Sequence, residues 1–279
     1  MTAMSLPVVT TPFLTNDESR ESLQIRVHGG EARPTLVYLP GLHGDWTLVT
    51  SFRKAIGNRA TFVEFTNPRT CTWSLADYAV AIEDSLREHK IDHGWLLGES
   101  FGSQIVWALV EREQFHVDGI VLAGGFVRHP MRWAARCLES ISGGIPLSWL
   151  TRIMFGYAKV ARFRYRMAPE TMAGIDEFIA RRTELDRQAA KHRLHLVAQS
   201  DPRNLLRNLK VPVYAISGFL DPIVPWCFVR PWLRHHAPAL REYRIIGSAD
   251  HNVLGTAPKE AARQVMQWIR STSEAQSPS

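Results

Sequence analysis

Cysteine is scarce in this sequence, with three residues among 279, at Cys71, Cys137 and Cys227. Their odd number and wide spacing match neither a disulfide framework nor a cysteine-based metal site. Unpaired thiols suit a reducing compartment. The chain also begins without the basic segment and the apolar run that together make a secretory signal. We therefore predict a cytoplasmic protein.

Long hydrophobic runs are absent too. No stretch reaches the roughly 20 consecutive apolar residues that a membrane-spanning helix requires. The composition is that of a globular protein, with 45% hydrophobic and 22% charged residues. A chain of 279 residues can form one large domain or a domain that carries an insertion. We expect no membrane partner, and oligomeric state cannot be read from these features.

Acidic residues are few in one segment. Between Val127 and His195 there are 13 Lys or Arg against 6 Asp or Glu, in a chain of net charge +6. This stretch also has a helical pattern and is rich in Trp, Met and Arg, so we interpret 127–199 as a helical cap inserted into the main domain. No nucleic-acid recognition motif accompanies the charge, so solvated basic helix faces explain it and we expect no nucleic-acid partner.

Two sets of side chains in this predicted cap indicate which classes of substrate the protein could bind. Its arginines at Arg162, Arg164 and Arg166 alternate along a short stretch and would suit an anionic acyl thioester. Its large apolar side chains either line an acyl pocket or form the core of the cap: Trp133, Trp149, Leu150, Met154, Phe155 and Phe163.

Outside the cap, short apolar runs alternate with helical patterns. This alternation predicts the α/β class, with a mostly parallel doubly wound sheet. We expect a core domain formed by 21–126 and 200–271, with termini at 1–20 and 272–279. Ser74 and Asp77 form a capping-box pattern at the start of one helix. The predicted strands are 35–39, 61–65, 94–98, 119–123, 212–217 and 241–246; the predicted helices are 47–56, 74–89, 103–113 and 258–270, and the tail 271–279 is predicted to be disordered.

The motif G-x-S-x-G occurs at 98–102, between a predicted buried strand and a predicted helix. A tight turn between two such elements crowds the backbone, which explains a glycine two residues to either side of Ser100. The same turn would lift the serine hydroxyl above the sheet, and the positive end of the following helix would favour developing negative charge. The five residues alone are a weak signal, but in this context they make Ser100 a candidate nucleophile.

Two further candidates follow later strands. Asp221 comes after the strand at 212–217 and His251 after the strand at 241–246. Since the carboxyl ends of parallel strands share one edge of a sheet, we expect both to lie near Ser100. An acid that orients a histidine, which in turn activates a serine, is the arrangement required for acyl transfer.

The loop at 40–45 follows the first predicted parallel strand. Ester cleavage needs two backbone N–H donors for the oxyanion of the tetrahedral intermediate. We predict that they come from Leu42 and from Phe101. His43 is interpreted as a loop-shaping residue and Asp45 as the N-cap of the next helix.

The order Ser100, Asp221, His251 resembles that of the α/β-hydrolase superfamily, and the resemblance extends over about 21–270. In that family the loop after the third strand often reads His-Gly, where this chain has Pro40–Gly41. A serine nucleophile excludes the chemistry of the aspartate-dependent dehalogenases and epoxide hydrolases of this fold. Carbon–carbon hydrolases of the fold often carry Asn before the serine, where this chain has Glu99.

The sequence thus predicts a serine hydrolase that cleaves carboxylic esters of small molecules through an acyl-enzyme, without a metal or an organic cofactor. Three alternatives stay open: an acyl thioesterase, a carbon–carbon bond hydrolase and a non-catalytic ligand-binding homologue. The natural substrate and its acyl chain length are not encoded in any feature recognised above.

Overall fold

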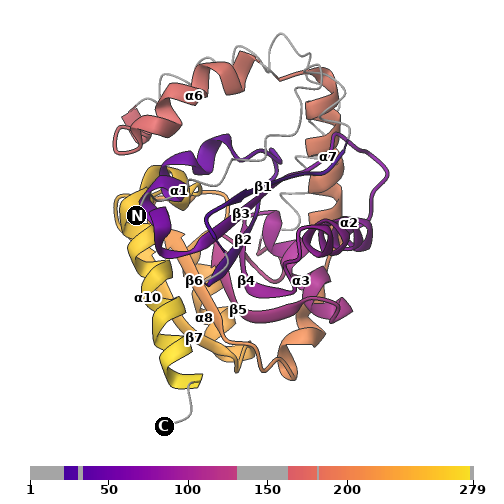
Figure 1. Ribbon diagram of the computed structural model, residues 1–279, viewed down its shortest axis with the longest axis vertical. Helices are drawn as coiled ribbons and strands as arrows, with labels where there is room; N and C mark the ends of the chain where they lie inside the picture. Colours follow the sequence, from indigo (N-terminus) through magenta and orange to yellow (C-terminus); the bar gives the residue numbers. More distant parts are fainter. Residues whose placement is uncertain (1–21, 31–33, 131–162, 181, 277–279) are drawn as a thin grey trace, which may run out of the picture.

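Seven strands form one mixed sheet in the computed structural model, which describes residues 22–30, 34–130, 163–180 and 182–276 (Figure 1). The strand order is β1-β3-β2-β4-β5-β6-β7. The edge strand β1 pairs antiparallel with β3, and the other neighbouring pairs are parallel. The prediction of a mostly parallel α/β sheet is confirmed. The elements are, in chain order, β1 (Gln24–His28), β2 (Thr35–Leu39), α1 (Thr50–Ile56), β3 (Thr61–Thr66), α2 (Leu75–Glu88), β4 (His93–Glu99), α3 (Gly102–Arg112), β5 (His116–Ala123), α6 (Pro169–Ala180), α7 (Glu184–Gln199), β6 (Val213–Gly218), α8 (Trp226–His236), β7 (Leu240–Ile246), α9 (Val253–Thr256) and α10 (Pro258–Gln276).

The sheet is covered on both faces because its central strands alternate between two hydrophobic clusters. Along β2, Val37 and Leu39 enter the cluster that contains α2, α3 and α8 residues. Leu36 and Tyr38 enter the cluster that contains α1 and α10 residues. All four side chains are fully buried, as the period of two along a strand between two helix layers requires.

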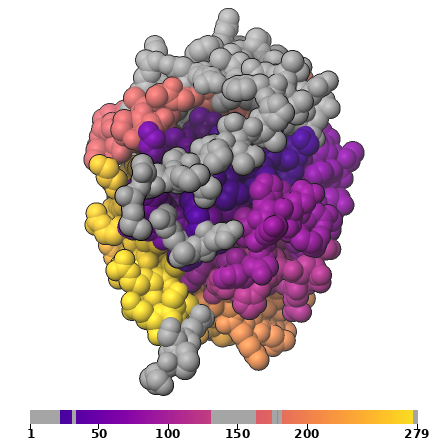
Figure 2. Space-filling model, in the orientation of Figure 1, coloured from indigo at the N-terminus to yellow at the C-terminus, as the bar shows by residue number. Residues whose placement is uncertain are grey.

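The helices α1, α2, α3, α8 and α10 pack with one face on this sheet. Figures 1 and 2 show α10 along one flank of the core and the segments around α2 and α3 along the opposite flank. At the start of α2, the Ser74 side chain accepts a hydrogen bond from the Asp77 amide, and the Asp77 carboxylate accepts one from the Ser74 amide, which confirms the predicted capping box. None of the helices in the described ranges combines the length and apolar composition of a membrane span.

A helical insert separates β5 from β6. Its described part contains α6 and α7, which rise beyond the edge of the sheet in Figure 1. Five of the six apolar cap residues singled out in the sequence lie outside the described residues, as does Arg162. The domain limits at 126/127 and 199/200 stay a prediction.

Several elements differ from the sequence-based prediction. The edge strand β1 and the helices α8 and α9 were not predicted; α8 contains Pro231, a residue type that argues against a helix interior. The helix expected over 47–56 is divided into a 3-10 turn at Thr47–Val49 and α1. The tail expected to be disordered is helical as far as Gln276.

Candidate active site

Ser100 occupies a strained turn between β4 and α3. Its φ is +50°, a left-handed conformation that non-glycine residues adopt only rarely. The turn is held on both sides, because the Ser100 amide donates to the carbonyl of Ala123 over 3.1 Å and the Ser103 amide donates to the carbonyl of Ser100 over 3.0 Å. The strain is thus maintained by surrounding backbone hydrogen bonds, as is common at functional sites.

The glycines on either side of this turn are required by close backbone contacts. A Cβ atom on Gly98 would lie 2.9 Å from the Cα of Ser103, and one on Gly102 would lie 2.1 Å from the carbonyl oxygen of Leu39. Both distances are too short for any side chain. The spacing G-x-S-x-G therefore has a steric cause in this chain.

Ser100, His251 and Asp221 form a hydrogen-bonded chain. The Nε2 atom of His251 lies 2.8 Å from the Oγ of Ser100, and its Nδ1 atom lies 2.8 Å from Oδ2 of Asp221. A carboxylate only accepts hydrogen bonds, so Nδ1 carries the proton and Nε2 accepts from the serine hydroxyl. The three predicted residues, which come from three separate loops, are thus brought together in the order serine, histidine, acid.

The Asp221 side chain is fully buried, and its second oxygen is also occupied. Oδ1 accepts hydrogen bonds from the amides of Ile223 and Val224, each over 2.9 Å. These two donors fix the carboxylate in one orientation and leave Oδ2 for the imidazole.

The loop that carries His251 is fixed by the insert. Asp250 forms an ion pair with Arg164, and the side-chain amide of Asn252 donates to the hydroxyl of Tyr165 over 2.7 Å. Asn252 also accepts from the Gly255 amide at the start of α9. Asp250 and Asn252, which flank His251, are therefore both anchored to the segment that precedes α6. No sequence motif predicted that this segment would have such a role.

The loop expected to supply an oxyanion donor lies against the nucleophile. A Cβ atom on Gly41 would lie 3.5 Å from the Cβ of Ser100. The Gly44 amide donates to the carbonyl of Gly41 over 2.9 Å, which closes the loop, and Gly44 has a φ of +65°. Among the described residues, neither the Leu42 nor the Phe101 amide has a hydrogen-bond acceptor.

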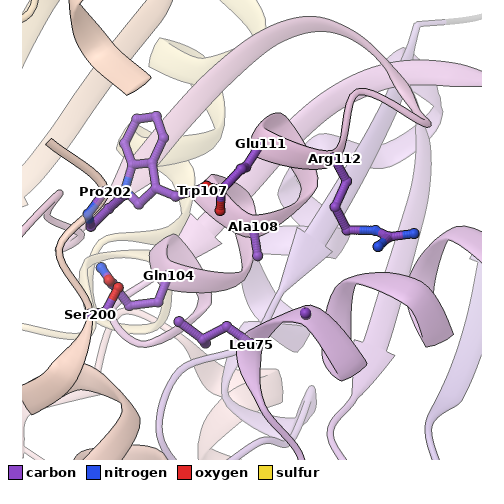
Figure 3. Close-up of a pocket in the computed structure, with 9 residues that line it drawn as sticks. Leu75, Gln104, Trp107, Ala108, Glu111, Arg112, Ser200 and Pro202 are labelled. Atoms are coloured by element: carbon purple, nitrogen blue, oxygen red, sulfur yellow. The ribbon is translucent and has the colours of Figure 1, made fainter. Parts of the chain in front are cut away.

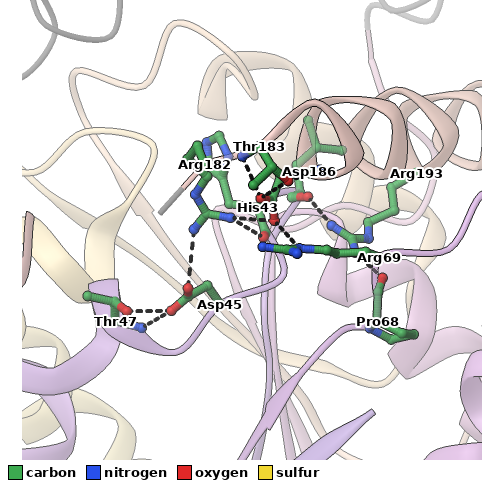
Figure 4. Close-up of polar contacts among 10 residues, drawn as sticks. His43, Asp45, Thr47, Pro68, Arg69, Arg182, Thr183, Asp186 and Arg193 are labelled. Atoms are coloured by element: carbon green, nitrogen blue, oxygen red, sulfur yellow. Dashed lines mark hydrogen bonds and ion pairs between the residues drawn. The ribbon is translucent and has the colours of Figure 1, made fainter. Parts of the chain in front are cut away.

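Charged side chains from the insert surround this loop (Figure 4). Arg182 donates to the carbonyl of His43 over 3.3 Å and pairs with Asp45 over 3.2 Å. Asp45 accepts from the amide of Thr47 over 2.7 Å, but the N-cap residue of the 3-10 turn is Trp46 and that of α1 is Val49, so the prediction of Asp45 as the N-cap is wrong. Desolvation, together with the nearby charges of Arg182 and Arg193, lowers the pKa of His43 to about 4.

The remaining predicted cap residues serve structural contacts. Arg164 is paired with Asp250, and the guanidinium of Arg166 lies over the ring of Phe163, 4.3 Å from its centroid. Phe163 itself is exposed. These contacts give no support to the idea that the alternating arginines recognise an anionic acyl carrier.

A small cavity lies away from the triad. Its volume is about 100 Å³, and it lies between α2, α3 and the segment after α7 (Figure 3). A typical ligand pocket occupies roughly 300–1,000 Å³, so this cavity is too small to be the substrate site. Among the described residues, no three His, Cys, Asp or Glu side chains come together as a metal site requires.

Comparison with known proteins agrees with this fold. No curated protein sequence matches the chain. Solved structures superpose closely at low identity. A hydrolase from Pseudomonas aeruginosa PA01 has a TM-score of 0.72 at 15% identity, covering 88% of this chain and 94% of that one. A structure from work on carboxylesterases of Nitrososphaera gargenis has a TM-score of 0.71 at 17% identity, covering 95% and 100%. A bromoperoxidase from Bacillus anthracis has a TM-score of 0.67 at 15% identity, covering 89% and 95%.

These similarities concern the fold, because identities this low carry no information on substrate. The family model for the alpha/beta hydrolase fold matches residues 50–258, which include Ser100, Asp221 and His251. With its mostly parallel sheet and its helical insert between β5 and β6, the chain belongs to the alpha/beta hydrolase fold family.

Proposed function

We propose that this protein is a serine esterase that hydrolyses carboxylic esters through an acyl-enzyme. The observation that carries the proposal is the continuous hydrogen-bonded chain from Ser100 through His251 to Asp221, with 2.8 Å at both steps. Its nucleophile candidate lies in a strained turn before a helix, where the hydroxyl is presented at the edge of the sheet.

In the first step, His251 takes the proton of the Ser100 hydroxyl as its oxygen attacks the ester carbonyl carbon. The amides of Leu42 and Phe101 are proposed to stabilise the resulting oxyanion. Collapse of the tetrahedral intermediate breaks the carbon–oxygen bond to the alcohol, and His251 donates its proton to that leaving oxygen.

In the second step, water replaces the alcohol. His251 removes a proton from the water as its oxygen attacks the acyl carbon, and the same proton returns to Ser100 when the acid leaves. Asp221 stays ionised throughout, holds the proton-bearing Nδ1 and stabilises the imidazolium. Some distant structural neighbours at 17% identity are themselves esterases, including one from Thermogutta terrifontis and one from Rhodococcus, so ester cleavage is a reaction that this fold accommodates.

Hydrolysis of p-nitrophenyl esters from acetate to palmitate tests this proposal. We expect turnover by wild type with an optimum at one range of chain lengths, and loss of turnover in Ser100→Ala. Ser271→Ala, an exposed serine on α10, is the matched control and should keep full activity. Turnover that persists in Ser100→Ala would show that another group attacks the ester.

A fluorophosphonate probe separates failure of the substrate from failure of the mechanism. Labelling of wild type but not of Ser100→Ala, without ester turnover, would retain Ser100 as nucleophile and direct the search to thioesters and carbon–carbon substrates. No labelling of wild type would favour a non-catalytic ligand-binding protein.

A further inference from the structure

Arg193 lies on α7, in the helical insert, but its guanidinium reaches the loop beside Ser100 (Figure 4). Nη1 donates to the carbonyl of Leu42 over 2.8 Å, and Nη2 donates to the carbonyl of Pro68 over 2.6 Å. Nε donates to the hydroxyl of Tyr78 over 3.3 Å. The side chain therefore joins the insert to two loops of the core.

The charge of Arg193 is buried without a carboxylate. The residue is 2% exposed, and all three of its acceptors are neutral oxygens. Within the described ranges it forms no ion pair. A buried cation of this kind is costly to fold, since carbonyl groups compensate only part of its lost hydration. The free-energy cost of burying this charge is explained if the charge contributes to the chemistry at the Ser100 site.

Two contacts fix both peptide groups that flank the Leu42 Cα. The carbonyl of Gly41 accepts from the Gly44 amide, and the carbonyl of Leu42 accepts from Arg193. Because a trans peptide is planar, fixing the Gly41 carbonyl also fixes the Leu42 N–H, which points the opposite way. The Leu42 N–H is thus held by two contacts. The Gly44 amide fixes the Gly41–Leu42 peptide, and Arg193 fixes the Leu42–His43 peptide.

Gly44 is required for this approach. A Cβ atom there would lie 2.8 Å from Nη1 of Arg193 and 3.0 Å from its Cζ, and the φ of +65° also favours glycine. The second glycine of the loop therefore makes room for the guanidinium.

We infer that Arg193 is a positioning residue for the oxyanion site: it fixes the Leu42 peptide and places a buried positive charge behind it. The inference rests on the proposed function, since it assigns the Leu42 N–H to the oxyanion. A positive charge in a desolvated site stabilises the anionic tetrahedral intermediate more than the neutral ester, so its effect falls on the rate of the chemical step.

The charged groups near Arg193 leave a positive electrostatic field around its guanidinium. Asp45 and Asp186 are engaged by Arg182, and Asp186 also by Arg69. The pKa of His43, next along the loop, is lowered in part by the charges of Arg182 and Arg193, so the field reaches the residue that follows Leu42.

Kinetics of Arg193→Ala and Arg193→Lys test the inference on the p-nitrophenyl ester that wild type cleaves fastest. We expect Arg193→Ala to lower kcat about 100-fold, as loss of one oxyanion donor does, with KM changed by less than about threefold. Arg193→Lys should recover part of kcat, because it returns the charge without the planar fork. Added guanidinium chloride at non-denaturing concentration should raise kcat of Arg193→Ala but not of Ser100→Ala.

Arg187→Ala on the same helix is the matched control, because Arg187 pairs with Glu184 within α7. A trifluoromethyl ketone, which forms the tetrahedral adduct with serine, should bind Arg193→Ala more weakly by the same factor as kcat/KM falls.

A raised KM with unchanged kcat would overturn the inference, as would equal kcat in all variants. Circular dichroism that shows both Arg193 variants unfolded at 25 °C would also overturn it, by reducing the residue to a fold-stabilising role.

The fluorophosphonate probe distinguishes this failure from that of the proposed function. Wild type that is not labelled would contradict both. Wild type and Arg193→Ala that are labelled at the same rate would contradict the inference alone, because phosphonylation of serine passes through an anionic state at the same oxygen position.

Discussion

The hydroxyl of Tyr38 donates a hydrogen bond of 2.5 Å to Oε2 of Glu99, the residue directly before Ser100. Both side chains are buried, and Oε1 of Glu99 has no hydrogen-bond partner among the described residues. Burial raises the pKa of Glu99 to about 7, against the opposing effects of the Tyr38 hydrogen bond and of His251. The carboxyl is thus close to half-protonated at neutral pH.

This pKa predicts how stability depends on pH. An unfolded glutamate has a pKa of about 4.3, so between that value and about pH 7 the folded chain retains a proton that the unfolded chain has lost. The unfolding free energy therefore falls as pH rises through this window, by up to about 4 kcal/mol, and this group adds no further loss above it.

Glu99→Gln should remove this contribution, because an amide accepts the Tyr38 hydrogen bond without titrating. We expect the variant to match wild type at about pH 4 and to be the more stable protein at about pH 8. Guanidinium unfolding at pH values across this range measures the difference. Glu88→Gln, on an exposed residue of α2, is the control and should follow wild type; a Glu99→Gln curve parallel to both would refute the prediction.

Asp221→Asn should lower kcat by on the order of 10⁴. The amide would keep its contacts with the loop amides through its oxygen but would present an NH₂ group to Nδ1 of His251. The ring proton would then move to Nε2, which no longer accepts from Ser100. Steady-state kinetics measure the loss, and Asp201→Asn, outside the triad and paired with Arg203, should retain activity. A loss below about tenfold would exclude Asp221 as the orienting acid.

Gly102→Ala should destabilise the fold by at least about 3 kcal/mol, the upper end of what overpacking usually costs. The added Cβ would lie 2.1 Å from the carbonyl oxygen of Leu39, and neither backbone segment can yield without moving β2 or α3. Gly247→Ala, whose Cβ would meet no atom within 4 Å, is the matched control. Thermal unfolding compares the two, and similar melting temperatures would contradict the steric account.

The contact between Tyr165 and Asn252 predicts an energetic coupling across the insert. Tyr165→Phe removes the acceptor of the Asn252 amide, and Asn252→Ala removes that amide together with the cap of α9. We expect the double variant to lose less stability than the sum of the single variants, with a coupling of about 0.5–1.5 kcal/mol. Urea unfolding of the four proteins measures it. Additive losses would mean that the hydrogen bond contributes nothing to stability.

The juxtaposition of Ser100, Asp221 and His251 was predictable because each follows a separate strand of a parallel sheet. Parallel strands bring their carboxyl ends to one edge, so position along the chain was sufficient to group them. The capping box at Ser74 was predictable for the opposite reason, since its two residues contact each other locally.

No comparable sequence signal indicates that Arg193 contacts the loop beside Ser100. Its two carbonyl partners lie 151 and 125 residues earlier in the chain, and a basic residue on a helix usually lies at the surface. In the sequence, Glu99 stands out only because related motifs often carry Asn at that position. Its burial could not be predicted, because that burial depends on the strands that flank β4. The end of α10 was predicted wrongly from its polar composition. The hydrogen bond of 2.8 Å between Thr272 and the buried Tyr214 ties that segment to the core.

The attachment of α7 to the loop beside Ser100 limits how this protein can be re-engineered. Exchange of the whole insert for that of a relative would remove the guanidinium that contacts Leu42 and Pro68. A chimera that retains Glu184–Gln199 keeps that contact, and one that also retains Arg164 and Tyr165 keeps the anchors of the His251 loop. Both parts of the insert therefore hold loops beside Ser100, so an exchange that aims only at the substrate has to preserve both sets of contacts.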